Sequence, residues 1–168
     1  LLLQKLSRSE SPEHVAPLAL ARLVKQAVAL KAAYEPMPVL QIEDAALKVV
    51  ADAERLERVI GHLIQNAIEA TPPDGSVSVH LARQEGSVLI RIADSGEGMS
   101  EEFIRERLFK PFDSTKSAGM GIGVFESREY IQELGGQMVV ASTPRVGTTF
   151  TILLPLYTAE TQLAESAA

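Results

Sequence analysis

Four short segments of this 168-residue chain carry side chains whose types and spacing suit binding of a metal, an amine or an anion. In the first, Arg55, His62, Asn66 and Glu69 fall along one flank of a helical apolar stripe that runs from residue 52 to residue 70. Asparagine and glutamate oxygens suit Mg²⁺, which takes few protein ligands and keeps waters and phosphates for the rest. Taken alone, such a flank is more often simply solvated.

The second segment is Ile92-Ala93-Asp94-Ser95-Gly96-Glu97-Gly98-Met99. Asp94 shares the parity of the apolar residues before it, so the alternation predicts a carboxylate on the core face at the end of a strand. A buried carboxylate is costly unless it meets donors, and the exocyclic amine of a purine is such a donor. Gly96 and Gly98 would let the backbone approach a planar ring. The alternative is an Asx turn that ends the strand.

The third segment, residues 116 to 123, has glycines at a predicted helix start, where amide N–H groups and the helix dipole favour an anion. Lys116 precedes them and could reach a phosphate. The segment is neither a Walker loop nor a Rossmann fingerprint. In the fourth, Gly147-Thr148-Thr149-Phe150, parity predicts that the Thr148 hydroxyl points inward; a threonine that merely favours a strand is the alternative.

The elements that would position these residues follow from periodicity and turn signals. The strongest helical pattern follows Asp52, a good N-cap, and ends near Ala70. Other helices are expected over residues 17–33, near 101–108, and from about 121 to the Gly135-Gly136 pair. Strands are expected near 39–43, 47–51, 77–81, 88–92, 138–141 and 150–154. Helices intermixed with hairpin strands predict an α+β two-layer sandwich.

Composition narrows the class of protein. A net charge of −6 argues against nucleic-acid binding, and the absence of cysteine excludes disulfides and cysteine–zinc sites. No apolar run approaches the roughly 20 residues of a membrane span, so no direct membrane contact is expected from this chain. We expect residues 1–11 to be the end of a preceding helix with its linker, 12–157 to be one domain, and 158–168 to be a disordered tail.

Together, the order and spacing of these segments resemble the nucleotide-binding boxes of the histidine-kinase and Hsp90/gyrase-type ATPase superfamily, which has the Bergerat (GHKL) fold. The resemblance covers residues 17 to 156. Asn66 matches the N box; Asp94, Gly96 and Gly98 the first glycine box; Phe109-Lys110-Pro111-Phe112 the F box typical of histidine kinases; Gly119, Gly121 and Gly123 the second glycine box; and Gly147-Thr148 the last box.

The resemblance implies a mixed sheet of about five strands against three helices, with an ATP–Mg²⁺ site under a lid running from about Glu97 to Ala118. It implies that Asn66 binds Mg²⁺, Asp94 the adenine amine and Lys116 the phosphates, with His62, Asn66 and Lys116 closest to the chemistry. The nucleotide contacts implied are Asn66, Glu69, Asp94, Gly96, Gly98, Met99, Phe112, Ser114, Thr115, Lys116, Gly119, Met120, Gly121, Ile122, Gly123 and Thr148.

Two departures from the family pattern shape the functional hypothesis. His62 stands where hydrolytic members have a glutamate base and many histidine kinases an asparagine, which disfavours hydrolysis without excluding it. None of the three histidines, His14, His62 and His80, lies in a phosphoacceptor motif. The implied reaction is therefore phosphoryl transfer from ATP to a histidine on a separate dimerisation domain. The alternatives are a hydrolytic clamp and a non-catalytic nucleotide-sensing module.

The resemblance also implies a setting. Partners would be the protein's own dimerisation domain and a response regulator. The full-length protein would be a homodimer anchored in the inner membrane, with this domain on the cytoplasmic side. The stretches Gly61–Asn66 and Gly119–Tyr130 look most like the sensor kinase of PEP-CTERM/exosortase systems, which is linked to exopolysaccharide output.

Overall fold

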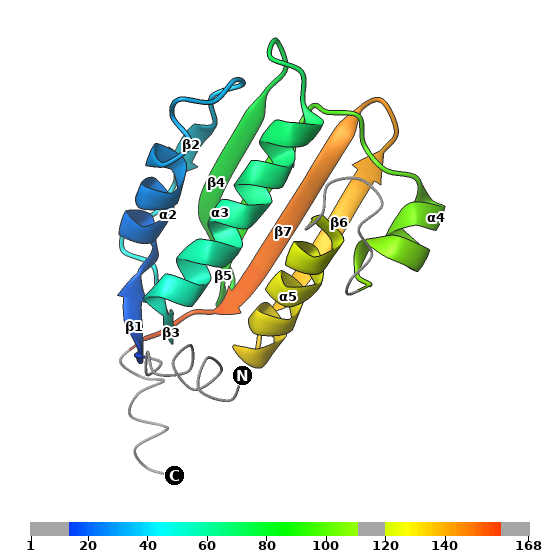
Figure 1. Ribbon diagram of the computed structural model, residues 1–168. Helices are drawn as coiled ribbons and strands as arrows, with labels where there is room; N and C mark the ends of the chain where they lie inside the picture. Colours follow the sequence, from blue (N-terminus) through cyan, green and yellow to red (C-terminus); the bar gives the residue numbers. More distant parts are fainter. Residues whose placement is uncertain (1–13, 111–119, 159–168) are drawn as a thin grey trace, which may run out of the picture.

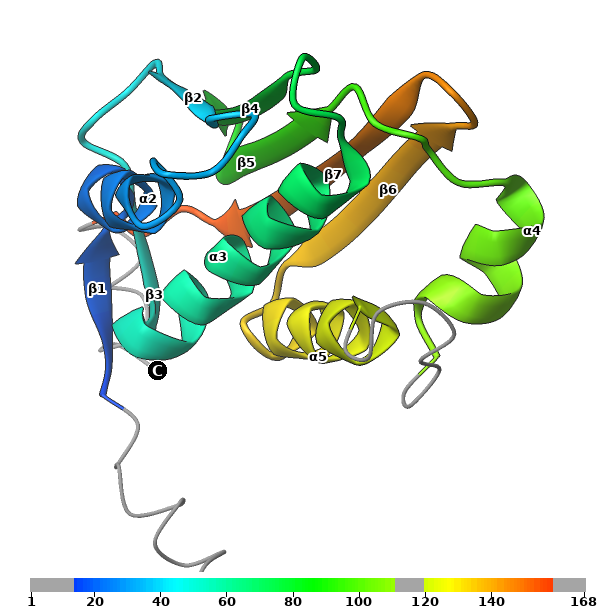
Figure 2. The same cartoon turned by 45° about the horizontal axis from the view of Figure 1, so that its top comes forward.

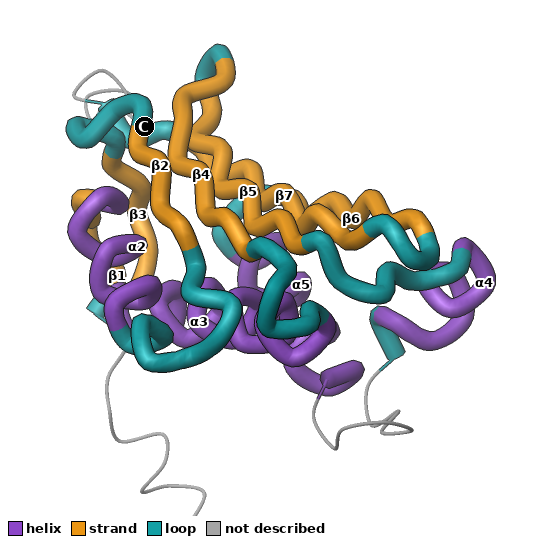
Figure 3. Tube along the Cα trace, turned by 90° about the horizontal axis from the view of Figure 1, so that it is seen from above, coloured by secondary structure: helices purple, strands orange, loops and turns teal. Residues whose placement is uncertain are grey.

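The computed structural model describes residues 14–110 and 120–158, and it forms two layers (Figure 1). One layer is a five-stranded sheet in the order β2-β4-β5-β7-β6. The other holds helices α2 (Leu20–Ala29), α3 (Ala53–Ala70) and α5 (Met120–Glu133). Seen from above, these helices all lie on one side of the sheet (Figure 3). The expected two-layer sandwich is confirmed.

The five-stranded sheet is mixed, as predicted. Strand β2 (Val39–Ile42) runs parallel to β4 (Val77–Gln84), and every other neighbouring pair is antiparallel. Strands β4 and β5 (Ser87–Asp94) form the predicted hairpin. Strands β6 (Gln137–Thr143) and β7 (Gly147–Pro155) form a second hairpin, in which β7 pairs with β5. The ends of β5 and β7 therefore meet, which brings Asp94 opposite Thr148.

The start of the domain differs from the prediction of a helix over residues 17–33. Val15–Ala19 is a strand, β1, which pairs with β3 (Lys48–Asp52) in a separate two-stranded sheet, and the helix begins only at Leu20. No side chain caps that helix at Ala19, so the sequence carried no local signal for its start. Pairing with a strand some 30 residues away decided the conformation instead.

Helix α3 crosses the middle of the sheet between α2 and α5 (Figures 1 and 2). Its apolar stripe is fully buried: Leu56, Ile60, Leu63 and Ile64 are each 0% exposed. The inward residues of β4, β5 and β7 complete the core, as their alternation predicted. Each such side chain contributes about 1.5–3 kcal/mol on burial. The polar edge of the same helix is consequently held at a fixed position over the sheet.

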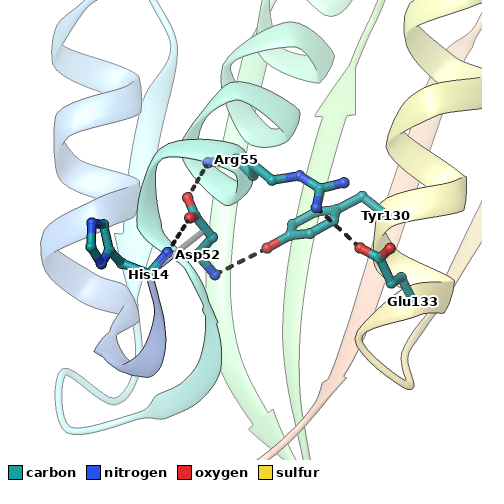
Figure 4. Close-up of polar contacts among 5 residues, drawn as sticks. All are labelled: His14, Asp52, Arg55, Tyr130 and Glu133. Atoms are coloured by element: carbon teal, nitrogen blue, oxygen red, sulfur yellow. Dashed lines mark hydrogen bonds and ion pairs between the residues drawn. The ribbon is translucent and has the colours of Figure 1, made fainter. Parts of the chain in front are cut away.

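A polar cluster ties the start of α3 to its neighbours (Figure 4). The Asp52 carboxylate accepts from the backbone N–H of Arg55 at 3.0 Å, the predicted N-cap, and from that of His14 at 2.9 Å. The Asp52 N–H donates to the Tyr130 hydroxyl at 3.0 Å. The Arg55 guanidinium lies 4.0 Å over the Tyr130 ring and pairs with Glu133 at 3.2 Å. The cluster joins β1, α3 and α5 at one end of the domain.

The predicted lid is described as far as Lys110. Residues 97–100 are irregular, and α4 (Glu101–Phe103) continues into η1 (Ile104–Leu108), which matches the helix expected near 101–108. Ser100 caps this helix by accepting from the N–H of Phe103 at 3.1 Å. Residues 111–118 of the lid lie outside the described residues. No helix in the described parts of the chain has the length and hydropathy to span a membrane.

Candidate functional site

A cavity of about 290 Å³ is lined by residues from the C-terminal half of α3, the end of β5, the start of β7, α4, η1 and α5. Its walls are mainly apolar, and Asn66, Asp94 and Thr148 contribute polar groups from three different elements. Small-molecule sites commonly have this character. The lining residues are Asn66, Ala67, Ala70, Asp94, Glu97, Gly98, Met99, Ser100, Phe103, Leu108, Val124, Thr148 and Phe150.

Asp94 is both a turn residue and part of the cavity wall. Its Oδ1 accepts from the N–H of Gly96 at 2.8 Å and from the N–H of Thr148 at 3.3 Å. Among the described residues, these hydrogen bonds all fall on Oδ1, so Oδ2 remains for a donor in the cavity. Burial raises the pKa of this carboxyl above its usual value, against the lowering effect of the two N–H donors. Asp94 is therefore a turn residue that also lines the cavity, and its contact with a purine amine stays a prediction.

Thr148 lies directly opposite Asp94 in the β5–β7 register and is 7% exposed. Its hydroxyl points inward, as parity predicted, and contacts the hydroxyl of Ser142 on β6 at 2.7 Å. Asp94, Thr148 and Ser142 thus form one row across three adjacent strands. Asp94 and Thr148 of this row make the polar floor of the cavity, and Ser142 supports Thr148 from the neighbouring strand.

Asn66 faces the cavity from α3 and is also 7% exposed. Its amide nitrogen has no hydrogen-bond partner among the described residues. A buried amide group without a partner costs about 1–3 kcal/mol, and a ligand in the cavity would satisfy it. The described residues hold no cluster of three His, Cys, Asp or Glu side chains. The side chain of Asn66 also carries an amide oxygen, which is the kind of ligand that Mg²⁺ accepts.

The structure does not bring Glu69 or His62 into this cavity lining. Glu69 is exposed, and its carboxylate accepts from the Gln65 side chain at 2.9 Å. His62 borders a separate hollow of about 320 Å³ between α3 and α5. Its ring lies against Gly123 so closely that a Cβ at position 123 would overlap the imidazole. Packing against His62 thus accounts for a glycine at position 123, and its place near an anion stays a prediction.

Gly96 and Gly98 permit a close approach, but it is to the chain's own backbone. A Cβ at position 96 would overlap the carbonyl of Ala70, and one at position 98, where φ is +69°, would overlap the carbonyl of Thr143. The intervening Glu97 donates its N–H to Ala70 at 3.1 Å and accepts from the N–H of Arg145 at 2.6 Å. The glycines therefore fix the start of the lid between the end of α3 and the β6–β7 turn.

The cavity also contains residues that the sequence analysis missed. Phe103, Leu108, Val124 and Phe150 supply apolar wall, and Ser142 lies behind Thr148. Phe150 shares the parity of Thr148, so its inward position was available from the sequence. Met99, which was predicted, lines the cavity and donates its N–H to Ser142 Oγ at 2.8 Å.

The far end of the described lid is fixed to α5. The Arg128 guanidinium lies 4.1 Å over the ring of Phe109, the first residue of the expected F box. Met120, Gly121 and Ile122 form the first turn of α5. The other predicted contacts, Phe112, Ser114, Thr115, Lys116 and Gly119, lie outside the described residues.

Comparison with known proteins agrees with this geometry. Residues 51–158 match the family of histidine kinase-, DNA gyrase B- and HSP90-like ATPases. The C4-dicarboxylate transport sensor protein DctB of Rhizobium meliloti is 36% identical over 117 residues, which are 68% of this chain and 18% of DctB. The alginate biosynthesis sensor protein KinB of Pseudomonas aeruginosa is 35% identical over 120 residues, which are 70% of this chain and 20% of KinB.

Among solved structures, the nucleotide-free catalytic domain of the histidine kinase ThkA matches with a TM-score of 0.73 and 27% identity, over 84% of this chain and 95% of that domain. The chain spans about a fifth of the length of the two curated relatives, at 18% and 20%. It therefore corresponds to one domain of such proteins. Because the family match extends over residues 51–158 and the fold agrees with that of a kinase catalytic domain, this chain belongs to the histidine kinase-, DNA gyrase B- and HSP90-like ATPase family and is the ATP-binding catalytic domain of a sensor histidine kinase.

Proposed function

We propose that this domain holds ATP with Mg²⁺ in the cavity between α3, β5, β7 and α5, and transfers the γ-phosphoryl group to a histidine on a dimerisation domain outside this chain. The observation that carries the proposal is the polar row of Asp94 and Thr148, which faces the buried amide of Asn66 across an apolar cavity of about 290 Å³.

The base-binding end is the row on the sheet. Asp94 Oδ2 accepts a hydrogen bond from an exocyclic amine, while Oδ1 stays occupied by the N–H groups of Gly96 and Thr148. The apolar walls around it suit the faces of a purine ring. A carboxylate acceptor at this point favours adenine, which has an amine at position 6, over guanine, which has a carbonyl there.

The phosphate-binding end is formed by α3 and the start of α5. Asn66 offers an amide oxygen to Mg²⁺ and is already buried, so it pays no further desolvation cost when the ion binds. The N-terminal turn of α5, from Met120, presents backbone N–H groups and the positive end of the helix dipole to an anion. Lys116 adds charge by the family resemblance. When bound, ATP supplies the phosphoryl group, and this chain's residues supply positioning and charge neutralisation.

The receiving histidine is expected from another domain. His80 lies between the inward residues Val79 and Leu81 of β4, so it is on the opposite face of the sheet, where it pairs with Glu43 at 3.0 Å. His14 lies at the far end of the domain from the cavity, beside the Asp52 cluster (Figure 4). His62 packs against Gly123 in the neighbouring hollow. A response regulator would then take the phosphoryl group from the dimerisation domain of a homodimeric kinase.

We further propose that the full-length kinase acts at the cytoplasmic side of the inner membrane in an exosortase-linked system with exopolysaccharide output. The stretches Gly61–Asn66 and Gly119–Tyr130 support this assignment. The similarity to KinB, whose name refers to alginate biosynthesis, is consistent with it. Transcript or polysaccharide measurements in a strain lacking the kinase would test it: unchanged exopolysaccharide output would contradict it.

Radiolabelled ATP tests the main proposal. The isolated domain should show negligible self-labelling and slow phosphate release, because by the family resemblance His62 stands where hydrolytic members have a glutamate base, and general-base help is typically worth 10²–10⁴-fold. Adding the native dimerisation domain should give acid-labile label on that domain. Brisk phosphate release by the isolated chain, abolished in His62→Ala, would support a hydrolytic ATPase instead. No nucleotide binding at all would leave a degenerate module.

A further inference from the structure

Ser142 is outside every motif of the sequence analysis, yet it lies on β6 directly beside Thr148 of the proposed base-binding site. On β6 it has the same parity as the inward residues Met138 and Val140, so its side chain is on the helix-covered face of the sheet. It pairs in register with Thr148, which in turn pairs with Asp94. Its hydroxyl therefore contacts Thr148 from β6, on the side opposite to Asp94 on β5.

Three groups meet at the Ser142 hydroxyl. Its Oγ accepts from the N–H of Met99 at 2.8 Å, lies 3.1 Å from the carbonyl oxygen of Gly147, and lies 2.7 Å from Thr148 Oγ1. Met99 is the first residue after the glycine box, where the lid begins. One hydroxyl thus connects the lid, the β6–β7 turn and the cavity floor.

The single proton of the Ser142 hydroxyl determines whether the Thr148 hydroxyl donates or accepts a hydrogen bond. A serine hydroxyl has one proton and two acceptor sites. The Gly147 carbonyl can only accept, so it takes the Ser142 proton, and Met99 occupies one acceptor site. The short contact with Thr148 is then complete when Thr148 donates to Ser142. Because the Thr148 proton is used in the hydrogen bond to Ser142, Thr148 presents only lone pairs to the cavity.

We propose that Ser142 is a positioning residue of the nucleotide site, which keeps the Thr148 hydroxyl as a hydrogen-bond acceptor beside Asp94 and anchors the lid at Met99. Two acceptors side by side can each accept one of the two N–H bonds of the adenine 6-amine, whereas the carbonyl at position 6 of guanine offers them no proton. The inference rests on the proposed nucleotide-binding function and deepens it, because it assigns part of the base specificity to a residue that does not touch the base.

The test uses calorimetric titration of the chain with ADP–Mg²⁺ and GDP–Mg²⁺. Ser142→Ala should weaken ADP binding about tenfold, the size expected when one or two neutral hydrogen bonds are lost, and should reduce the preference for ADP over GDP. Ser142→Thr keeps the hydroxyl and should restore both. Ser78→Ala is the matched control, because Ser78 is exposed on the opposite face of the same sheet.

A purely structural role would not change base preference, so that ratio is the deciding measurement. Combining Ser142→Ala with Thr148→Val should give less than the sum of the two single effects, since Ser142 acts through Thr148. The Met99 amide should exchange faster in Ser142→Ala. If that variant does not fold, Ser142→Cys, which is isosteric and hydrogen-bonds weakly, takes its place. Unchanged affinity and base preference, with Asp94→Asn impaired, would overturn the inference; absence of ADP binding by the wild type would overturn the proposed function instead.

Discussion

Replacing Asp94 with asparagine reverses one hydrogen-bonding group in the proposed base site with almost no change in shape. Oδ1 of Asp94 already accepts from the backbone N–H groups of Gly96 and Thr148. In Asp94→Asn the amide oxygen is expected to keep that position, because the two donors require an acceptor. The new NH₂ group then takes the place of Oδ2 and points a donor at the exocyclic amine of adenine.

The size of the effect follows from what is lost. A hydrogen bond to a charged group is worth about 1.5–3 kcal/mol, and a donor facing a donor adds the cost of an unsatisfied group. ADP binding should therefore weaken by at least about 10- to 100-fold. The carbonyl at position 6 of guanine would meet the new donor favourably, so the preference for ADP over GDP should shrink or reverse.

Folding of Asp94→Asn should not suffer. Burial raises the pKa of Asp94, so in the absence of ligand its ionisation opposes folding as pH rises from the carboxyl's unfolded pKa through its folded pKa. A neutral asparagine avoids that cost, and the free energy of unfolding near pH 7 should equal or exceed that of the wild type. Calorimetric titration with ADP–Mg²⁺ and GDP–Mg²⁺, beside a denaturant melt, measures both effects. Wild-type ADP affinity in a folded Asp94→Asn variant would show that Asp94 is only a turn residue.

Three further changes test how the site is supported. Tyr130→Phe leaves the buried N–H of Asp52 without its acceptor and should lower the free energy of unfolding by about 1–3 kcal/mol in a urea melt. The control Tyr34→Phe, at a residue 46% exposed, should lower it little. Equal effects would contradict the role of the Tyr130 hydroxyl. Asp52→Asn should lower stability at neutral pH, because N–H donors, chiefly that of Arg55, lower the pKa of Asp52. This contribution is complete above the unfolded pKa near 4 and disappears as pH falls through the folded pKa, so a difference from wild type that did not shrink as pH was lowered below about 4 would refute it. Gly123→Ala should destabilise α5 by overlap with the His62 ring, and His62→Ala in the same chain should recover much of the loss; additive effects in melts of the four proteins would show that the two residues do not pack together.

The proposed site was predictable wherever a local pattern determined side-chain direction. The helical period fixed α3 and the inward edge that carries Asn66, and the capping chemistry of Asp52 fixed where that helix begins. Strand alternation placed Asp94 and Thr148 on the covered face of the sheet. These predictions succeeded because the period of a helix or strand is a property of the backbone, which neighbouring residues set together.

The tertiary structure alone decided which groups meet. Val15–Ala19 is a strand because it pairs with β3, and β3 lies far away in the sequence. Glu69 shares the helix flank of Asn66 but extends into solvent, and His62 packs on Gly123, because the position of α5 determines which part of that flank is covered. Ser142 gives no signal in the sequence, since its importance comes from the register that sets it beside Thr148. Direction is encoded locally, but contact depends on how β7 inserts between β5 and β6, and no single segment contains that information.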